Sequence, residues 1–167
     1  MAEERTDRHA LPLLQAGQAQ KEMTHNEALV LLDLIAGAAA EAVAEVPPSA
    51  PEPGQCWIVG ATPVGAWTGQ ADALAGWTES GWRFVVPREG LSVWLAAAGC
   101  TAAWQGGAWR IGAAHARSLS VDGTQVVGAQ QPAIADPAGG GTVDAEARAT
   151  LAAILAALRT HGLVAPA

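Results

Sequence analysis

The longest proline-free apolar stretch of the chain lies between Ala28 and Val46. Just before it, Thr24 and Glu27 have the spacing of a capping box, in which the two side chains bond to each other's backbone amides at a helix N-terminus. We therefore predict a long helix over residues 24–46, about 33 Å in length. Its apolar positions cover more than one face, which is more than one small domain would bury. We expect copies of this helix to pack through its main stripe, Leu29, Leu32 and Ile35.

The residues on either side of this helix have no helical or strand pattern. The first ten are charged, as in a loosely ordered terminus, and Leu11–Lys21 begins apolar and then becomes rich in glutamine. We interpret residues 1–23 as an extended N-terminal arm. After the helix, a proline-rich segment over residues 47–54 predicts a stiff linker.

Beyond this linker the sequence consists of short apolar runs separated by glycine and proline. Trp77–Phe84 and Trp104–Ile111 echo each other, since each has a glycine-containing turn, a Trp on either side of it and an Arg after the second Trp. In a hairpin, such Trp residues lie across from one another or diagonally. With further strands at Gln55–Val59 and Leu91–Leu95, we predict that residues 55–112 form a small antiparallel, Trp-rich meander or half-open barrel of about five or six strands.

The last third of the chain combines one hairpin, a linker and one helix. Within residues 113–142, Asp122-Gly123 is a favoured turn dipeptide between two short apolar runs, and the rest is rich in glycine and proline. A helical pattern returns over residues 143–163, with Gly162 at the position of a C-terminal cap. Its apolar stripe consists of Leu151, Ile154 and Leu158. This three-and-four spacing is that of a coiled-coil seam, too short to be stable alone, so we expect self-association and an α+β fold overall.

Composition limits the partners of the chain. Nine Lys and Arg residues stand against 16 Asp and Glu residues, which gives a formal net charge of −7, so we expect no nucleic-acid partner. The apolar run of the first helix is interrupted by Glu41 and is too short for a bilayer, and the N-terminus has no apolar signal region, so we expect no membrane insertion. Cys56 and Cys100 lack the spacing of a metal site and are interpreted as reduced, buried thiols.

The sequence contains none of the common catalytic or nucleotide-binding motifs, such as GxSxG, GxxxxGK[ST], HExxH or CxxC. His25 is interpreted as a polar residue near a helix cap rather than a metal ligand. A glycosidase would need two carboxylates about 5–9.5 Å apart, and those near the sheet are Asp72, Glu79 and Glu89. Their places in predicted turns favour solvated loop residues. We therefore expect no enzyme activity, no catalytic residue, no metal and no cofactor.

The seven tryptophans stand beside a single phenylalanine, so Trp has to supply much of the large-residue packing. We assign four of them to the core: Trp57, Trp82, Trp94 and Trp109. The remaining three flank predicted turns: Trp67, Trp77 and Trp104. An exposed indole face can stack on a sugar ring, so these three are the candidate carbohydrate-binding residues.

Specific segments of the sequence resemble a family found in alphaproteobacterial prophages and gene transfer agents and known only as a domain of unknown function. The most distinctive is Leu11–Leu29, LPLLQAGQAQKEMTHNEAL, and the resemblance extends over about residues 9–112. Shorter matching segments are Gly54–Val59, Gly65–Gly69, Gly81–Phe84 and Pro87–Gly90. Residues 144–163 are similar to the helical end of the same sort of virion proteins. Because no catalytic residues are established for that family, the resemblance implies none here.

The resemblance implies a virion appendage, a head spike or tail fibre, that contacts cell-surface polysaccharide or anchors a part that does. We therefore expect a structural subunit that is made in the bacterial cytoplasm and assembled into a virion-like particle. Its expected partners are other copies of itself, as a homotrimer, other virion structural proteins and host capsular polysaccharide. The alternatives are a stand-alone carbohydrate-binding module and a glycan hydrolase.

Overall fold

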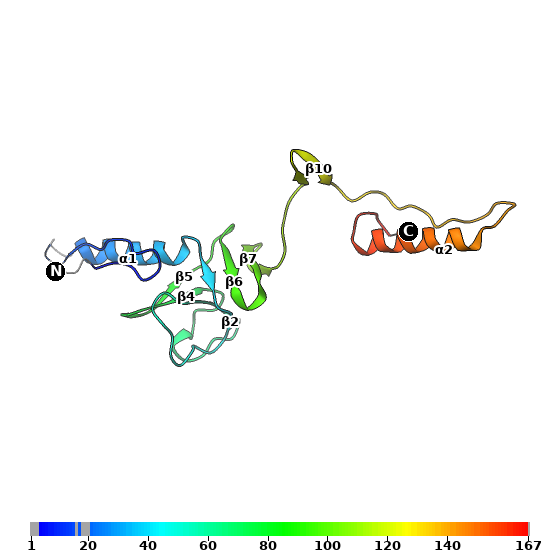
Figure 1. Cartoon of the computed structure of the whole chain (residues 1–167). Coiled ribbons are helices and arrows are strands. Elements are labelled where there is room, and N and C mark those ends of the chain that lie inside the picture. The colour runs from blue at the N-terminus through cyan, green and yellow to red at the C-terminus, as the bar shows by residue number, and fades with distance from the viewer. Residues whose placement is uncertain (1–3, 16, 18–20, 167) are drawn as a thin grey trace. The chain divides into compact units, whose positions relative to one another are not determined.

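The structure of the chain is a computed structural model that describes residues 4–15, 17 and 21–166 (Figure 1). The chain divides into two compact units, an N-terminal unit of residues 1–113 and a C-terminal unit of residues 114–167. The N-terminal unit begins with helix α1, Lys21–Ile35. Its described strands are β1 (Ala39–Ala40), β2 (Val43–Ala44), β3 (Cys56–Val59), β4 (Leu74–Thr78), β5 (Gly81–Val85), β6 (Ser92–Leu95), β7 (Cys100–Gln105) and β8 (Ala108–Ile111). Short 3₁₀ helices, η1 (Gly65–Trp67) and η2 (Ala96–Ala98), lie in two of the connections.

The strands of the N-terminal unit form two four-stranded sheets with the same plan. The strand orders are β2-β3-β4-β5 and β1-β6-β7-β8, and in each sheet the first strand is parallel to the second while the others are antiparallel. The mixed α and β character that we expected is therefore confirmed. The prediction that residues 55–112 form a single meander is wrong. This region supplies three strands to each sheet, and residues 39–44 supply the fourth strand of each, β1 and β2.

The two predicted Trp hairpins are confirmed and occupy equivalent places in the two sheets. Trp77 pairs with Trp82 across β4 and β5, and Trp104 pairs with Trp109 across β7 and β8. Their ring centroids lie 5.0 Å and 5.6 Å apart in edge-to-face geometry. This arrangement suits the quadrupoles of two aromatic rings.

Helix α1 is shorter than predicted, because it runs over Lys21–Ile35 instead of residues 24–46. Thr24 lies inside the helix, so the predicted capping box does not form. The helix ends at a turn in which Gly37 has a φ of +55°, a left-handed conformation that favours glycine. The alanine-rich residues that follow then enter the two sheets, and the small side chains of Ala38 and Ala40 are buried between them. Packing against the sheets has overridden the helix propensity of alanine.

The main hydrophobic core lies where α1 and the two sheets meet. It contains buried residues of both sheets together with the end of α1: Leu34, Ala38, Ala40, Cys56, Ile58, Leu74, Val93, Leu95 and Ala102. A second cluster covers the opposite face of the β2-β3-β4-β5 sheet, and its centre is Trp67 of η1, which has no exposed surface. Trp67 contacts Trp57 and Trp82 there, with ring centroids 6.4 Å and 5.1 Å away.

The C-terminal unit contains the predicted hairpin and the predicted helix. Strands β9 (Leu119–Val121) and β10 (Thr124–Val127) pair across Asp122-Gly123, both of which have positive φ. Helix α2, Ala145–Thr160, has Asp144 as its N-cap, and the Asp144 carboxylate accepts a 2.8 Å hydrogen bond from the Ala147 amide. At its other end, the Gly162 and Leu163 amides bond to Arg159 O and Leu158 O, as in a Schellman motif. Neither of the helices in the described residues has the length and apolarity needed to cross a bilayer.

Candidate functional site

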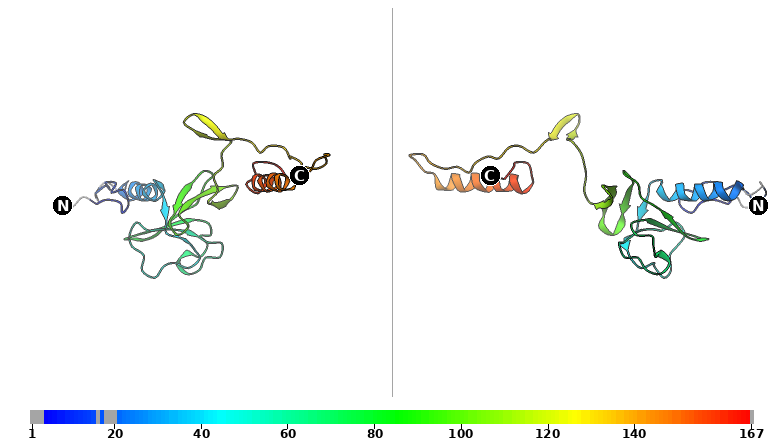
Figure 2. Two further views of the ribbon diagram at one scale, coloured as in Figure 1. Left: turned by 45° about the vertical axis from the view of Figure 1, so that its right-hand side comes forward. Right: turned by 180° about the vertical axis from the view of Figure 1, so that it is seen from behind.

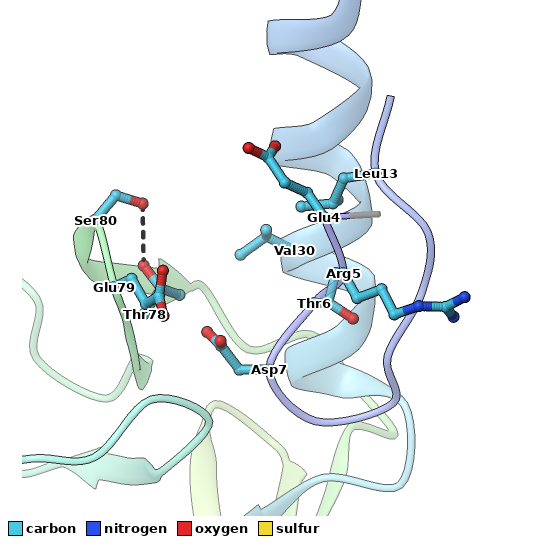
Figure 3. Close-up of a pocket in the computed structure, with 9 residues that line it drawn as sticks. All are labelled: Glu4, Arg5, Thr6, Asp7, Leu13, Val30, Thr78, Glu79 and Ser80. Atoms are coloured by element: carbon cyan, nitrogen blue, oxygen red, sulfur yellow. Dashed lines mark hydrogen bonds between the residues drawn. The ribbon is translucent and has the colours of Figure 1, made fainter. Parts of the chain in front are cut away.

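A polar cavity of about 610 Å³ lies in the N-terminal unit between residues 4–13, α1 and the turn joining β4 to β5 (Figure 3). Its walls combine carboxylates, hydroxyls and two apolar side chains. The lining residues are Glu4, Arg5, Thr6, Asp7, Leu13, Val30, Thr78, Glu79 and Ser80.

One wall of the cavity is a small hairpin formed by residues 4–13, which runs beside α1 (Figure 2). Thr6 N donates to Leu11 O at 3.0 Å and Leu13 N donates to Glu4 O at 2.8 Å. The hairpin is tied to the helix by Asn26, whose side chain accepts from the Leu14 amide and donates to the Leu14 carbonyl. The first residues were expected to be loose, and this expectation is wrong for the described part of the segment. The glutamine-rich part of the predicted arm, residues 18–20, lies outside the described residues.

The end of the hairpin is fixed on α1 by Asp33, which is only 3% exposed. Its carboxylate accepts hydrogen bonds from the Arg8 and His9 amides at 2.9 Å and 2.8 Å. The Arg8 guanidinium donates to Leu34 O, and the His9 ring contacts Ala36 O at 2.6 Å. These contacts satisfy carbonyls that the end of a helix leaves without partners. Asp33 therefore both positions the cavity and helps to end α1.

The opposite wall is the β4–β5 turn, which holds two hydroxyls and one carboxylate at the cavity. Thr78 is buried, and its hydroxyl donates to Gly81 O at 2.8 Å and lies 3.4 Å from the Ser80 hydroxyl. The side chain of Asp7 points toward this turn, where Glu79 lies (Figure 3). Desolvation raises the pKa of Asp7, and the charges of Glu79 and Asp33 raise it further. The cavity therefore concentrates negative charge.

The described residues around the cavity were compared with the side-chain groups that metal sites and glycan hydrolysis need. In the described residues, no group of three His, Cys, Asp or Glu side chains is placed to hold a metal ion. Of the three carboxylates considered for glycan hydrolysis, Glu79 alone lines this cavity. Asp72 uses its backbone carbonyl to accept from Trp109 Nε1, and Glu89 accepts from the Gly106 amide. The structure thus does not bring these three residues together at this cavity.

A second hollow, of about 420 Å³, is apolar and lies between α1 and β5. It contains two of the residues predicted to mediate oligomerisation, Leu32 and Ile35, which are 52% and 37% exposed. The other lining residues are Ala28, Leu31, Phe84, Val85, Val86 and Arg88. Leu29, the third residue of the predicted stripe, is half-buried. Nearby, Glu27 forms a 2.9 Å ion pair with Arg83, which ties α1 to β5.

The candidate sugar-binding tryptophans are largely used in packing. Trp67 is completely buried, so its predicted exposure is wrong. Trp77 and Trp104 are half-buried, and each contacts the Trp on the neighbouring strand. The exposed tryptophan is instead Trp94, at 50%, which we had assigned to the core. Its neighbours Val93 and Leu95 are buried, and the two-residue period of a strand turns Trp94 to the opposite face.

The apolar stripe of α2 is largely exposed to solvent in a single copy of the chain. Leu151 and Ile154 each have 50% of their surface free, and Leu158 is half-buried. The β9–β10 hairpin is exposed at every position. In the described part of the C-terminal unit, Val164 is the one buried residue.

Both cysteines are free thiols, as expected. Cys56 lies in the core, where burial raises the pKa of its thiol in spite of the nearby Arg8 guanidinium, while Cys100 is half-buried.

The sequence analysis did not predict the contacts of Arg8 and Asp33. The signal available was a charged residue, Asp33, between Leu32 and Leu34 in an apolar helix, since such a residue needs a partner when it is buried.

Comparison with known proteins places the chain in a family but assigns it no activity. A search of curated proteins finds no match. A family model described as a protein of unknown function matches residues 25–110, which include most of α1 and the eight described strands of the N-terminal unit except the last residue of β8. Because this match covers more than half of the 167 residues, the chain belongs to the DUF2793 family.

Proposed function

We propose that the chain is a non-catalytic structural subunit of a phage-like or gene-transfer-agent particle, a head spike or tail fibre, that assembles as a homotrimer. In the proposed assembly, the C-terminal unit packs against its copies and the N-terminal unit contributes to attachment to cell-surface polysaccharide. The resemblance of Leu11–Leu29 to prophage and gene-transfer-agent proteins supports the particle, and the exposed apolar surface supports the assembly.

The observation that carries the proposal is the near absence of a core in the described part of the C-terminal unit, where Val164 alone is buried. An isolated two-stranded hairpin is marginally stable in water, and a helix in a protein gains most of its stability from packing of its apolar face. Four apolar side chains of the hairpin are 40–55% exposed: Leu119, Val121, Val126 and Val127. Packing of several copies would bury this surface together with the stripe of α2.

The test is the mass of the full chain in solution, measured by analytical ultracentrifugation. We expect a stable trimer, and we expect the double substitution Leu151→Glu and Ile154→Glu to dissociate it because two charges would enter the seam. Ala156→Glu is the matched control, since Ala156 is exposed and lies on the opposite side of α2 from both residues at ~100° per residue. A wild-type chain that is monomeric at micromolar concentration would contradict the proposed assembly.

Membership in a particle requires a separate measurement. We expect the chain to sediment with particles purified from a producing culture and to be detected in them by mass spectrometry. Presence of the chain in the cell extract and its absence from purified particles would contradict this part of the proposal.

A further inference from the structure

Helix α2 has one face that contacts its own unit and another that is left in solvent. Residues 134–139 run beside the first face, where Arg148 donates to Gly139 O and Arg159 forms a 3.0 Å ion pair with Asp136 (Figure 1). Leu151 and Ile154 lie on the second face, and each is 50% exposed. The surface that the proposed trimer would bury is therefore open in a single copy.

The seam on this second face extends one residue beyond its apolar positions. Its members, separated by four, three, four and three residues, are Ala147, Leu151, Ile154, Leu158 and His161. A step of three leads from an a to a d position, so the two leucines occupy a positions, and Ile154 and His161 occupy d positions. Leu at a with Ile at d favours trimers and tetramers over dimers. The pattern supports the proposed trimer and puts a histidine in its last layer.

His161 continues the helix although it follows the last residue of α2. Its amide donates to Ala157 O at 3.0 Å, and its φ of −79° and ψ of −1° are those of a right-handed turn. The side chain is exposed, and in the described part of the chain its ring has no hydrogen-bond partner. Both nitrogens of the imidazole are therefore available to a ligand.

Threefold symmetry brings the same residue of every copy to one axis. Helices that a threefold axis relates are parallel and in register, so each layer of the seam contains three identical side chains. After the apolar layers of the leucines and Ile154, the layer of His161 would contain three imidazoles. Within one copy, no three His, Cys, Asp or Glu side chains of the described residues are placed to hold a metal ion. The site is complete only when three copies assemble.

We infer that three His161 imidazoles, one from each copy, bind a divalent transition-metal ion such as zinc on the axis of the trimer. Neutral imidazole is a common ligand of such ions, and three imidazoles leave a fourth position for water. The C-terminal end of a helix carries partial negative charge, and three such ends would meet at this layer, which favours a cation over an anion. The inference rests on the proposed trimer and adds a metal that was not expected from the sequence.

The experiment is isothermal titration calorimetry of the untagged full chain, treated with EDTA and dialysed, at about pH 7.5, where imidazole is neutral. We expect about one zinc ion to bind for every three chains. Magnesium, which prefers oxygen ligands, should not bind. His161→Ala should abolish zinc binding. His161→Leu should abolish it and keep the trimer, because leucine continues the apolar seam. His115→Ala is the matched control, since His115 is likewise exposed and lies outside α2.

The mass of each protein is measured by analytical ultracentrifugation on the same samples, with and without zinc. The inference fails if the wild-type trimer does not bind zinc, or if His161→Ala binds zinc as the wild type does. In either case a trimeric mass leaves the proposed assembly standing. A wild-type chain that is monomeric both with and without zinc would contradict the assembly and the metal site together.

Discussion

At the scale of single residues, Gly76 of β4 lies close against Leu34 of α1. A Cβ added at Gly76 would lie 2.3 Å from Leu34 Cδ2, and Leu34 is only 2% exposed. Gly76 does not have a positive φ, so glycine is needed here for space and not for backbone conformation. The need for glycine at position 76 therefore comes from a helix that lies about 40 positions earlier in the chain.

We expect Gly76→Ala to lower the free energy of unfolding by ~1–3 kcal/mol, because the buried Leu34 side chain or the strand must shift. Urea denaturation of the full chain followed by tryptophan fluorescence measures this change. Gly141→Ala is the control, since an added Cβ there meets no atom within 4 Å. Equal stability of the Gly76→Ala and wild-type proteins would contradict the close packing.

Asp7 gives a second residue-scale prediction, based on pH. Desolvation and the charge of Glu79 raise the pKa of Asp7 above its ordinary value of 3.8. Between pH 3.8 and the raised pKa of Asp7, the folded state therefore binds more protons than the unfolded state. The contribution of Asp7 to the free energy of unfolding falls as the pH rises through this range. We expect Asp7→Asn to raise the melting temperature at pH 7 and to have little effect below pH 3.8, where the carboxyl is protonated in both states.

Thermal unfolding followed by circular dichroism at both pH values checks the Asp7 prediction. The exposed Glu52, which lies outside the lining of the cavity, provides the control substitution Glu52→Gln. An increase in melting temperature that is equally large at acidic and neutral pH would show that Asp7 acts through something other than its charge.

At the scale of elements, the two helices differ in what decides their ends. The start and end of α2 depend on local signals, Asp144 at the N-cap and Gly162 with a φ of +71° after the last turn. These signals are legible in the sequence, and the predicted span 143–163 contains the observed helix. The end of α1 depends instead on Arg8 and His9, which reach its last carbonyls from more than 20 residues earlier. Within residues 24–46, the charged Asp33 signals that this end of the helix has a partner but not which residues supply it, so the predicted helix was too long.

We expect Asp144→Ala to destabilise α2 by about 1 kcal/mol, because the Ala147 amide loses its acceptor. The measurement is the helical signal of the full chain at 222 nm as a function of temperature. Thr142→Ala is the matched control, because Thr142 is exposed and lies just outside the cap. An unchanged helical signal in Asp144→Ala would mean that contacts other than the cap hold α2 in place.

At the scale of the whole molecule, the two units differ in how much they bury by themselves. The N-terminal unit has two hydrophobic clusters and two sheets of related plan. The described part of the C-terminal unit consists of elements whose apolar side chains are almost all in solvent. The first unit can therefore be stable as one copy, whereas the proposed assembly would supply the stability of the second.

We expect the unfolding midpoint of the chain, followed by helical signal, to rise with protein concentration, because association stabilises only the assembled state. The Leu151→Glu and Ile154→Glu double variant should lose this dependence, and Ala156→Glu should keep it. A wild-type midpoint that is the same at all concentrations would contradict assembly through the C-terminal unit.

The sequence by itself determined the features whose causes are local. The Trp hairpins around Gly81 and Gly106-Gly107, the β9–β10 turn at Asp122-Gly123 and the caps of α2 all depend on residues within a few positions of one another. Only the tertiary structure decided that the β region forms two sheets, that the alanine-rich segment after Ile35 joins both of them, and which tryptophans are exposed. These features depend on contacts between distant segments. The two-residue alternation of β6 separates Trp94 from Val93 and Leu95, but only the packing of the core shows which face is in solvent.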